Sequence, residues 1–373
     1  MPAVPAPGDP PPRDELIAAY GFSSAAEALI PFGPGRIHRS YRLVDGAHAW
    51  LLQQLNTRVF PHVSALAANV AAVTAHLAAG PQGTLASGRP RPQLTLRPTR
   101  AGAPLYETAD GHWWRAYRFI DGAAPGIPTD LEQVRQAAAC FGEFLRACAD
   151  LPADSLALTI PHFHDTAYRY RVFADAVTGD VMGRARDCAE LIAFAQARAP
   201  LADRLEDLAR ANGVPQRVVH NDCKLDNVLF DASNGEALCV VDLDTVMPGL
   251  AWHDIGDLIR SAAATGGEDG DALALDPQRF EAVVSGYLAG VGDLLSSAEQ
   301  LHLTDAAQVI TYELGLRFLT DHLAGDTYFR VQASGDNLRR AQRQFGLLTS
   351  MERQASALLR VVERAAAGSA VAR

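Results

Sequence analysis

Short apolar runs separated by turn residues dominate the first third of the chain, and they predict strands. A loop containing Gly35 opens an expected strand that ends near residue 44, and Asp45-Gly46 is a typical hairpin turn into a second strand over residues 48–55. Three more strands are expected at residues 93–96, 105–107 and 112–120. These segments predict a small antiparallel sheet, with helices over residues 14–20 and 61–77 beside it.

Beyond residue 121 the spacing of apolar residues becomes helical. Thr129-Asp130-Leu131-Glu132 matches a capping box and begins a helix that runs to about residue 149. Further helices are expected at residues 164–177, 184–197, 201–211, 277–289, 303–323 and 336–366. The change of pattern predicts a disordered Pro-rich leader over residues 1–12, an N-terminal lobe over residues 13–120 and a C-terminal lobe over residues 121–373.

Length and composition limit the class of protein. A chain of 373 residues exceeds one ordinary compact unit, and a hydrophobic content of 48% fits a globular protein with a sizeable core. The formal net charge of −10 argues against nucleic acid and anionic membrane as partners, since both require a basic surface. The five cysteines are scattered, which favours neither a disulfide framework nor a zinc site. No signal peptide or membrane span is visible, so we expect a cytoplasmic location.

The strongest chemical signal lies in residues 217–260. An apolar strand leads towards Asp222, Asn227 follows five residues later, and a second apolar strand ends on Asp242. Asn234-Gly235, between the two strands, suits a tight hairpin. Pairing of the strands therefore predicts that Asp222, Asn227 and Asp242 lie near one end of the pair.

These residue types suit the transfer of a phosphoryl group from a nucleotide. That reaction needs a carboxylate to orient the attacking hydroxyl and oxygen ligands to hold Mg²⁺ against the phosphates. Asp222 suits the first task, and Asn227 with Asp242 suits the second, with Asp244 as a candidate further ligand. Lys224 can place a positive charge on the transferred group. The alternative is that these Asp and Asn residues only cap turns between strands.

Two motifs stand in order, HNDCKLDN at residues 220–227 and VDLD at residues 241–244. They resemble motifs of the aminoglycoside phosphotransferase and choline kinase superfamily, whose members are small-molecule kinases. The strings DLDTVMPG at residues 242–249 and GLRFLTD at residues 315–321 are similar to N-acetylhexosamine 1-kinases, which phosphorylate an anomeric hydroxyl. The resemblance implies an α+β, two-lobed protein-kinase-like fold, with a small N-terminal antiparallel sheet lobe and a larger, mainly helical C-terminal lobe.

The resemblance also implies where a nucleotide binds. The first hairpin covers the phosphates, which places Gly35 beside them. Tyr117 and Phe119 lie in a segment that resembles the last strand of the sheet and the hinge between the lobes. In the family, adenine binds near this hinge. Protein kinases carry a Lys on the second strand and a Glu on the next helix, whereas this chain has Gln53 at the Lys position and neither Asp nor Glu in residues 46–106. That departure leaves nucleotide specificity open.

Several residues are candidates for the acceptor side. His38 is a candidate sugar contact, and the alternative is an exposed strand residue. Glu313, Arg317 and Asp321 recur every four residues on one helix face, either as a surface ladder of ion pairs or as the lining of the acceptor pocket. Apolar flanking residues favour the pocket, in which Arg317 would donate to sugar oxygens. Tyr328 either stacks on the sugar or packs in the core.

Two structural residues follow from the resemblance. The carboxylate of Asp254 would accept hydrogen bonds from the backbone of the catalytic loop and from His220. Asp257, one turn further along the expected helix, is expected on its surface. Residues 265–276 are acidic and rich in glycine, and we expect a solvated loop there.

The sequence therefore predicts a kinase that transfers the γ-phosphoryl group of ATP to the anomeric hydroxyl of N-acetylglucosamine or N-acetylgalactosamine. Mg²⁺ is the expected cofactor, and a sugar and a nucleotide are the expected partners. One alternative is the same chemistry on choline, homoserine or an aminoglycoside. Another is a pseudokinase that binds ligands without catalysis, which the missing Lys and Glu allow.

Overall fold

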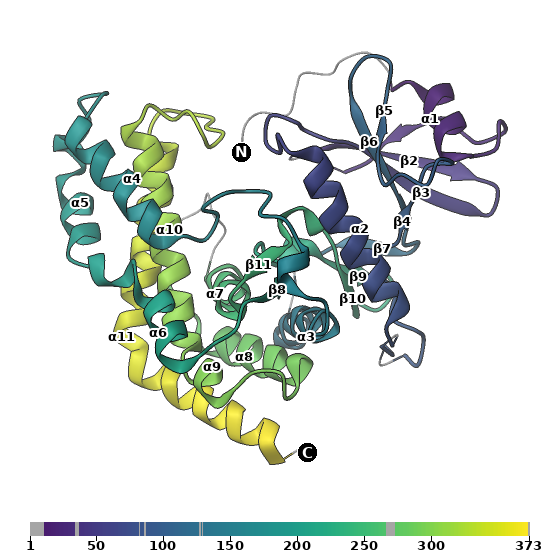
Figure 1. Ribbon diagram of the computed structural model, residues 1–373. Coiled ribbons are helices and arrows are strands. Elements are labelled where there is room, and N and C mark those ends of the chain that lie inside the picture. Colours follow the sequence, from purple (N-terminus) through teal and green to yellow (C-terminus); the bar gives the residue numbers. More distant parts are fainter. Residues whose placement is uncertain are drawn as a thin grey trace.

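The computed structural model describes residues 11–33, 37–81, 83–85, 87–126, 128, 130–265 and 273–371. Residues 1–10 of the leader, Gly35, Thr129 and most of the acidic loop lie outside these residues. The molecule has a sheet part of modest size and a larger helical part (Figure 1).

The sheet part is built on six antiparallel strands. The order is β1-β2-β3-β6-β4, and β5 also pairs with β6. The strands are β1 (Ile30–Pro31), β2 (Arg39–Asp45), β3 (His48–Gln54), β4 (Leu96–Arg97), β5 (Tyr106–Glu107) and β6 (Trp113–Arg118). Gly46 turns β2 into β3 with a left-handed φ of 62°, as the hairpin sequence requires.

Alternate side chains of β6 face two different layers. Trp114 packs with Leu16 of α1 (Arg13–Tyr20), whereas Tyr117 packs with Val70 of α2 (Val63–Ala79). The two faces of the sheet are therefore both covered. Asn69 of α2 also donates to the backbone oxygen of Val246 at 3.0 Å, and α2 lies between the sheet and the helical part (Figure 1).

The helical part contains short strands at its boundary with the sheet part. They form a three-stranded sheet with the order β10-β9-β7 and a pair of β11 with β8. The strands are β7 (Ala123–Pro125), β8 (Arg217–Val219), β9 (Val228–Asp231), β10 (Ala237–Val240) and β11 (Met247–Gly249). The helices are α3 (Leu131–Ala147), α4 (Thr166–Gly179), α5 (Ala189–Gln196), α6 (Arg204–Asn212), α7 (Ala251–Ala262), α8 (Pro277–Val291), α9 (Ser297–Leu301), α10 (Leu303–Leu323) and α11 (Asp336–Val371).

The start of α3 corrects one expectation. Its first helical residue is Leu131, and the N-cap is Asp130, whose carboxylate accepts a hydrogen bond from Gln133 N at 2.8 Å. The N-cap therefore lies one residue later than the expected capping box places it, and Glu132 pairs with Arg135 at 2.6 Å. Thr129 of that box lies outside the described residues. Asp is as strong an N-cap as Thr, so the helix begins one residue later.

Glycines set the spacing of α3 and α8, which cross closely in the main core. A Cβ atom on Gly286 would lie 2.1 Å from the backbone oxygen of Arg135, and one on Gly290 would lie 2.2 Å from that of Ala139. Larger residues at these two positions would push the helices apart. The packing of α3 against α8 thus requires residues without a side chain at the crossing.

The sheet part and the larger helical part confirm the expected α+β architecture. β6 ends at Arg118, and β7, which begins at Ala123, already pairs with β9 of the helical part. The boundary near residue 121 stays a prediction that is compatible with this pairing. Among the described residues, no helix is long and apolar enough to cross a membrane.

Candidate active site

Asp254, in the first turn of α7, anchors the loop between β8 and β9. The buried carboxylate accepts hydrogen bonds from the backbone N–H groups of His220 at 2.9 Å and Asn221 at 2.7 Å. The His220 ring does not take part in this contact. Its Nε2 lies 3.1 Å from the backbone oxygen of Val241, beside Asp242. The loop is thus fixed to a helix on one side and to the end of β10 on the other.

Asp222 lies at the centre of a small charged cluster. Its Oδ2 accepts hydrogen bonds from Lys224 Nζ at 2.6 Å and from Asn227 Nδ2 at 2.9 Å. Burial raises the pKa of Asp222, but the Lys224 ammonium and the hydrogen bonds outweigh burial, so the pKa lies below its usual value. The side chain is 25% exposed. Asp222 is therefore an ionised carboxylate that a small molecule can reach.

Backbone pairing between the ends of β9 and β10 brings Asp242 close to Asp222 and Asn227. Val241 N–H donates to the backbone oxygen of Asn227 at 2.9 Å, which joins the end of β10 to the start of β9. Burial raises the pKa of Asp242, and the neighbouring carboxylates of Asp244 and Asp222 raise it further. A divalent cation at this point would relieve the repulsion between these carboxylates. Asn227 uses its amide nitrogen on Asp222 and offers its amide oxygen as a second ligand.

The donor set fits Mg²⁺ bound together with a nucleotide. Across the described part of the chain, no group of three or more His, Cys, Asp or Glu side chains is placed to hold a metal ion. Mg²⁺ in phosphoryl-transfer enzymes commonly takes one or two protein ligands, because phosphates and water complete its octahedral shell. Asn227 and Asp242 could supply that number.

Asp244 is held by two side chains of the sheet part. Its two oxygens accept hydrogen bonds from Arg115, with Nη2 to Oδ2 at 3.0 Å, and Oδ2 also contacts Nε2 of His38. Burial raises the pKa of Asp244, but Arg115 and His38 lower it well below its usual value. The other ring nitrogen of His38 accepts from Asn56 N–H at 3.0 Å, and His38 is 6% exposed. The expectation of an exposed strand residue at His38 is therefore wrong.

The residues expected near the nucleotide lie in different surroundings. Gln53 Oε1 accepts from Arg115 Nε at 2.9 Å, and Gln53 Nε2 donates to Ser40 at 3.0 Å. Tyr117 lies in the core at 2% exposure, and among the described residues its hydroxyl has no hydrogen-bond partner. Phe119 packs edge-on against Phe32, with ring centroids 5.1 Å apart. Gly35 lies outside the described residues.

Residues 28–299 match the model of a family described as the phosphotransferase enzyme family. The match covers the sheet part, the catalytic loop and the segment after β10. The chain belongs to this phosphotransferase family. That membership makes the protein a small-molecule phosphotransferase.

Solved structures with this fold span nearly the whole phosphotransferase chain. An aminoglycoside phosphotransferase from Alicyclobacillus acidocaldarius has a TM-score of 0.62 at 14% identity, covering 95% of this chain and 99% of that one. A microcompartment-associated aminopropanol kinase has a TM-score of 0.56 at 16% identity, covering 93% and 97%. A spectinomycin phosphotransferase in complex with ADP and spectinomycin has a TM-score of 0.55 at 13% identity, covering 91% and 97%. The expected two-lobed, protein-kinase-like fold is confirmed.

A buried carboxylate of α10, Glu313, connects through His164 to the loop between β8 and β9. Glu313 accepts a hydrogen bond from Thr166 at 2.8 Å and contacts His164 Nδ1 at 3.1 Å. The other nitrogen of His164, Nε2, lies 3.0 Å from the backbone oxygen of Asn221. Burial lowers the pKa of His164, but Glu313 raises it above its usual value. A charged imidazole can donate to both acceptors, so His164 joins α10 to the loop that carries Asp222.

Arg317 lies one turn beyond Glu313 and faces two aromatic rings. Its guanidinium carbon is 5.5 Å from the ring centre of Phe163 and 5.6 Å from that of Phe329, and Nη1 is 3.9 Å from Glu313. Glu313 is 1% exposed, so the surface ladder considered from the sequence is wrong. Tyr328, which begins the turn into Phe329, is 50% exposed.

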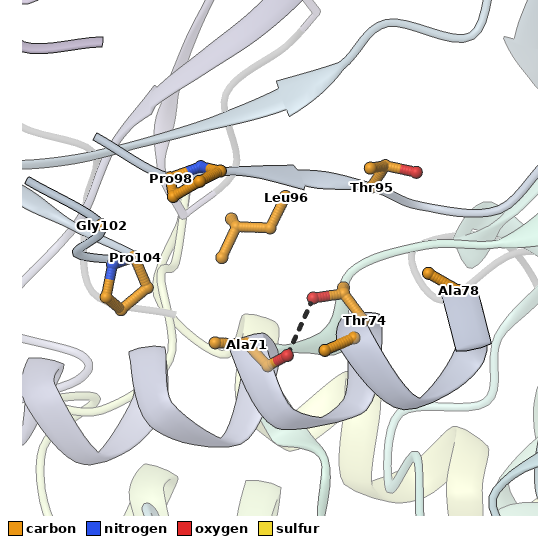
Figure 2. A pocket seen from close by; sticks show the side chains of 9 residues that line it. Ala71, Thr74, Ala78, Thr95, Leu96, Pro98, Gly102 and Pro104 are labelled. Atoms are coloured by element: carbon orange, nitrogen blue, oxygen red, sulfur yellow. Dashed lines mark hydrogen bonds between the residues drawn. The ribbon is translucent and has the colours of Figure 1, made fainter. Parts of the chain in front are cut away.

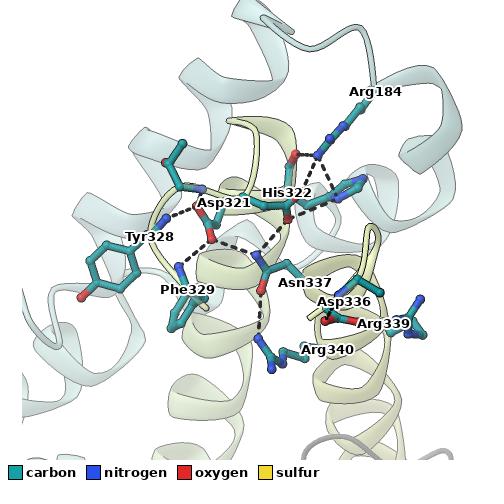
Figure 3. A network of polar contacts seen from close by, with 12 residues as sticks. Arg184, Asp321, His322, Tyr328, Phe329, Asp336, Asn337, Arg339 and Arg340 are labelled. Atoms are coloured by element: carbon teal, nitrogen blue, oxygen red, sulfur yellow. Dashed lines mark hydrogen bonds and ion pairs between the residues drawn. The ribbon is translucent and has the colours of Figure 1, made fainter. Parts of the chain in front are cut away.

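Asp321 shapes the loop after α10 instead of pairing with Arg317. Its carboxylate accepts hydrogen bonds from three successive backbone N–H groups, residues 327–329, and from Asn337 Nδ2 at 2.8 Å (Figure 3). These bonds fix the segment that holds Tyr328 and Phe329. Asp321 therefore acts on the position of its neighbours.

The expectation for Asp257 is also corrected. Asp257 is 6% exposed and pairs with Arg260 at 2.8 Å. Because α7 is enclosed by α3, α8 and α10, even its polar residues are buried, and each of these two finds its partner in the other.

A hollow of about 260 Å³ lies between α2 and β4 (Figure 2), and it is lined by none of Asp222, Asn227 and Asp242. Small or apolar side chains line it, including Ala71, Ala75, Leu96 and Pro104. The Thr74 hydroxyl in its wall already donates to the backbone of its own helix, with the oxygen of Val70 at 2.7 Å and that of Ala71 at 3.2 Å. Phosphates require positive charge or free donors, so this hollow does not fit a nucleotide.

Reasoning from the sequence missed Arg115 and His164. Arg115 had a local signal, since a lone charge in the apolar strand WWRAYR must find a buried partner. His164 had none, because its two partners are 57 and 149 residues away along the chain.

Proposed function

We propose that the phosphotransferase transfers the γ-phosphoryl group of ATP to the anomeric hydroxyl of an N-acetylhexosamine. The observation that supports the chemistry is the convergence of Asp222, Lys224, Asn227 and Asp242 at the ends of β9 and β10. Carboxylate, ammonium and amide groups in one cluster are what phosphoryl transfer needs. The same cluster speaks against a binding module without catalysis.

Each residue of the cluster has a task in this proposal. Oδ2 of Asp222 is occupied by Lys224 and Asn227, so Oδ1 is the oxygen that accepts the hydrogen bond of the acceptor hydroxyl and orients it. Burial lowers the pKa of Lys224, but Asp222 and Asp242 raise it above its usual value, so Lys224 stays charged beside the transferred group. Bound Mg²⁺ neutralises phosphate charge, and Asn227 with Asp242 would hold it.

The charge near α10 favours an uncharged acceptor. Arg317 lies beside Glu313, and a second cation, Arg169, has its pKa lowered by burial and then by Arg317. Glu313 is already bound by His164 and Thr166. Choline and aminoglycosides are cations, which bind acidic and aromatic groups. Sugar hydroxyls and an acetamido oxygen can instead accept hydrogen bonds from arginine. The exposed ring of Tyr328 offers an apolar surface for a sugar face.

Two residues that the sequence suggested as ligands, His38 for the sugar and Asp244 for Mg²⁺, are bound by other side chains or backbone of the protein. Both ring nitrogens of His38 have protein partners, so we do not assign it to the sugar. Both oxygens of Asp244 are bound by Arg115, so we do not assign it to Mg²⁺.

A panel assay tests the proposal. Purified protein with ATP and Mg²⁺ is given N-acetylglucosamine, N-acetylgalactosamine, glucose, choline, homoserine and an aminoglycoside, and the products are examined by ³¹P NMR. We expect a sugar phosphate whose phosphorus couples to the anomeric proton. Turnover of choline or an aminoglycoside without turnover of either N-acetylhexosamine would reject the sugar. ATP consumption with none of the acceptors would reject the reaction.

A further inference from the structure

We infer that Arg115 and His38 of the sheet part are positioning residues that set the place of the magnesium ligand Asp242 by gripping Asp244. The inference rests on the proposed function, because it concerns the residue that would hold Mg²⁺.

The contact crosses from one lobe to the other. Arg115 lies on β6 and His38 just before β2, whereas Asp244 lies in the short turn after β10. The side chains of Arg115 and Asp244 are 3% and 2% exposed, so water does not screen the pair. Arg115 binds both oxygens of Asp244, a geometry that fixes orientation as well as distance.

The position of the ring hydrogen in the His38–Asp244 contact follows from the second hydrogen bond of His38. Nδ1 of His38 accepts a hydrogen bond from Asn56 N–H, so the neutral ring carries its hydrogen on Nε2. Nε2 then donates to Oδ2 of Asp244. The ring also lies against Phe60, with centroids 5.6 Å apart, which holds its plane. His38 therefore contacts Asp244 directly and is itself held by Asn56 and Phe60.

Asp242 is two residues from Asp244 and has little freedom of its own. Its φ of 66° is left-handed, and the next residues, Leu243–Thr245, form a single 3-10 turn. A shift of Asp244 is therefore passed to Asp242 through two rigid peptide links. Buried ion pairs add little net stability, so a role in stability alone does not account for this arrangement.

The neighbourhood of Gln53 on β3 disfavours the lysine that protein kinases carry at this position. Gln53 stands opposite Arg115 in the β3–β6 register and accepts a hydrogen bond from Arg115 Nε. A lysine at this position would place a second cation against the guanidinium. The buried cation of this sheet therefore lies on β6, and its carboxylate partner lies in the other lobe.

Metal binding tests the inference independently of the acceptor. Mn²⁺, which replaces Mg²⁺ and is visible by EPR, is titrated into the full chain with ADP. The variants are Arg115→Gln, Asp244→Asn and the double variant. We expect each single variant to weaken Mn²⁺ binding by about ten-fold or more, and the double variant to be no weaker than the worse single one, since all three break one contact. Arg198→Gln is the matched control, because Arg198 grips Glu352 with two bonds of 2.8 Å and lies in the helical part.

The outcomes separate the two proposals. Wild-type protein that fails to bind Mn²⁺ with ADP would overturn the proposed function. Wild-type protein that binds, with both single variants equal to it, would overturn the gripping of Asp244 alone. Weaker binding of ADP itself in Arg115→Gln, with Asp244→Asn unaffected, would show that Arg115 acts on phosphate and would also overturn it.

A milder pair of variants covers the case in which the charged variants do not fold. His38→Phe keeps a ring against Phe60 but removes the donor to Asp244, and we expect weaker Mn²⁺ binding by about three-fold or more. His38→Gln restores an N–H near the position of Nε2 and is expected to recover most of the affinity. Equal affinities for His38→Phe and wild type would contradict the inference.

Discussion

The surroundings of each acid decide its ionisation, and with it the chemistry that the acid can perform. Asp222 and Asp242 lie close together, yet their pKa values shift in opposite directions. Lys224 and Asn227 stabilise the charge of Asp222, whereas Asp242 faces two other carboxylates. A carboxylate that orients the acceptor hydroxyl must be ionised before any metal binds. A carboxylate that repels its neighbours is instead stabilised in its ionised form when a cation binds. The two shifts match these two tasks.

Removal of the Asp222 charge tests the first task. We expect Asp222→Asn to lower kcat by about 10²–10⁴, because the amide cannot orient or accept a proton from the hydroxyl, while ADP still binds. Steady-state kinetics and ADP titration measure the two effects. Asp226→Asn, an exposed residue of the same loop, is the control and should keep its activity. Near-normal turnover of Asp222→Asn would remove Asp222 from this role.

His253 gives the protein a predictable weakness towards acid. Burial, and then the nearby His164, lower the pKa of His253 to about 3, against about 6.5 in the unfolded chain. The folded pKa is depressed, so the contribution to stability is complete above about pH 6.5 and is lost as the pH falls from there towards 3. The loss is about 1.4 kcal/mol for each pH unit in that window.

Urea denaturation at about pH 7.5 and about pH 5 measures this effect. We expect His253→Phe to lose about 2 kcal/mol less free energy of unfolding between the two conditions than wild type. His112→Phe, which replaces an exposed histidine of the sheet part, should behave as wild type. Equal losses in His253→Phe and wild type would contradict the buried neutral state.

At the scale of elements, periodicity located helices and strands well, but packing decided what their polar residues do. The bounds expected for α10 agree with the observed Leu303–Leu323. Its residues Glu313 and Asp321 nevertheless have partners on α4, on the following loop and on α11. Helical spacing shows which residues share a face, but it does not show what covers that face. For this reason both a surface ladder and a buried lining were compatible with the sequence.

The crossing of α3 and α8 gives a prediction about stability. We expect Gly290→Ala to lower the free energy of unfolding by about 1–3 kcal/mol or more, because the added Cβ meets the backbone of Ala139, which cannot move aside. Gly346→Ala is the matched control in α11, where the nearest atom would be 3.7 Å away, and it should stabilise by about 0.4–1 kcal/mol. Urea denaturation measures both, and equal stability of the two variants would contradict the close crossing.

In the molecule as a whole, the lobes share an apolar core and are also joined by specific polar contacts. Arg115 and His38 reach Asp244, and Asn69 of α2 reaches the backbone of Val246. These contacts link the sheet lobe to the segment that follows β10. A nucleotide bound between the lobes with Mg²⁺ would add a further link at the same place.

Ligand removal tests that link. At a hundred-fold excess over its Kd, ADP with Mg²⁺ should stabilise the protein by about 2.7 kcal/mol and raise Tm by several degrees. EDTA should reverse most of the shift, because Asn227 and Asp242 would hold the nucleotide through the metal in the proposed site. Asp242→Asn should show little Mg²⁺-dependent shift. A shift that is the same with Mg²⁺ and with EDTA would argue against these ligands.

Local patterns in the chain were enough to reveal the family resemblance, the α+β division and the positions of most helices and strands. They also predict which side chains would perform phosphoryl transfer. These properties depend on local spacing, so neighbours along the chain are enough to reveal them. The bonds of Asp222 to Lys224 and Asn227 lie within five residues, and the motif could therefore be recognised.

Only the tertiary structure decided which charges meet across long stretches of chain. Asp244 and Arg115 are separated by 129 residues and Asp244 and His38 by 206, so no local pattern pairs them. The same holds for His164 with Glu313, and for the burial of Asp257 inside a crowded helical lobe. A charged side chain shows in the sequence that it needs a partner or water. Which of these it receives depends on how the lobes and helices pack.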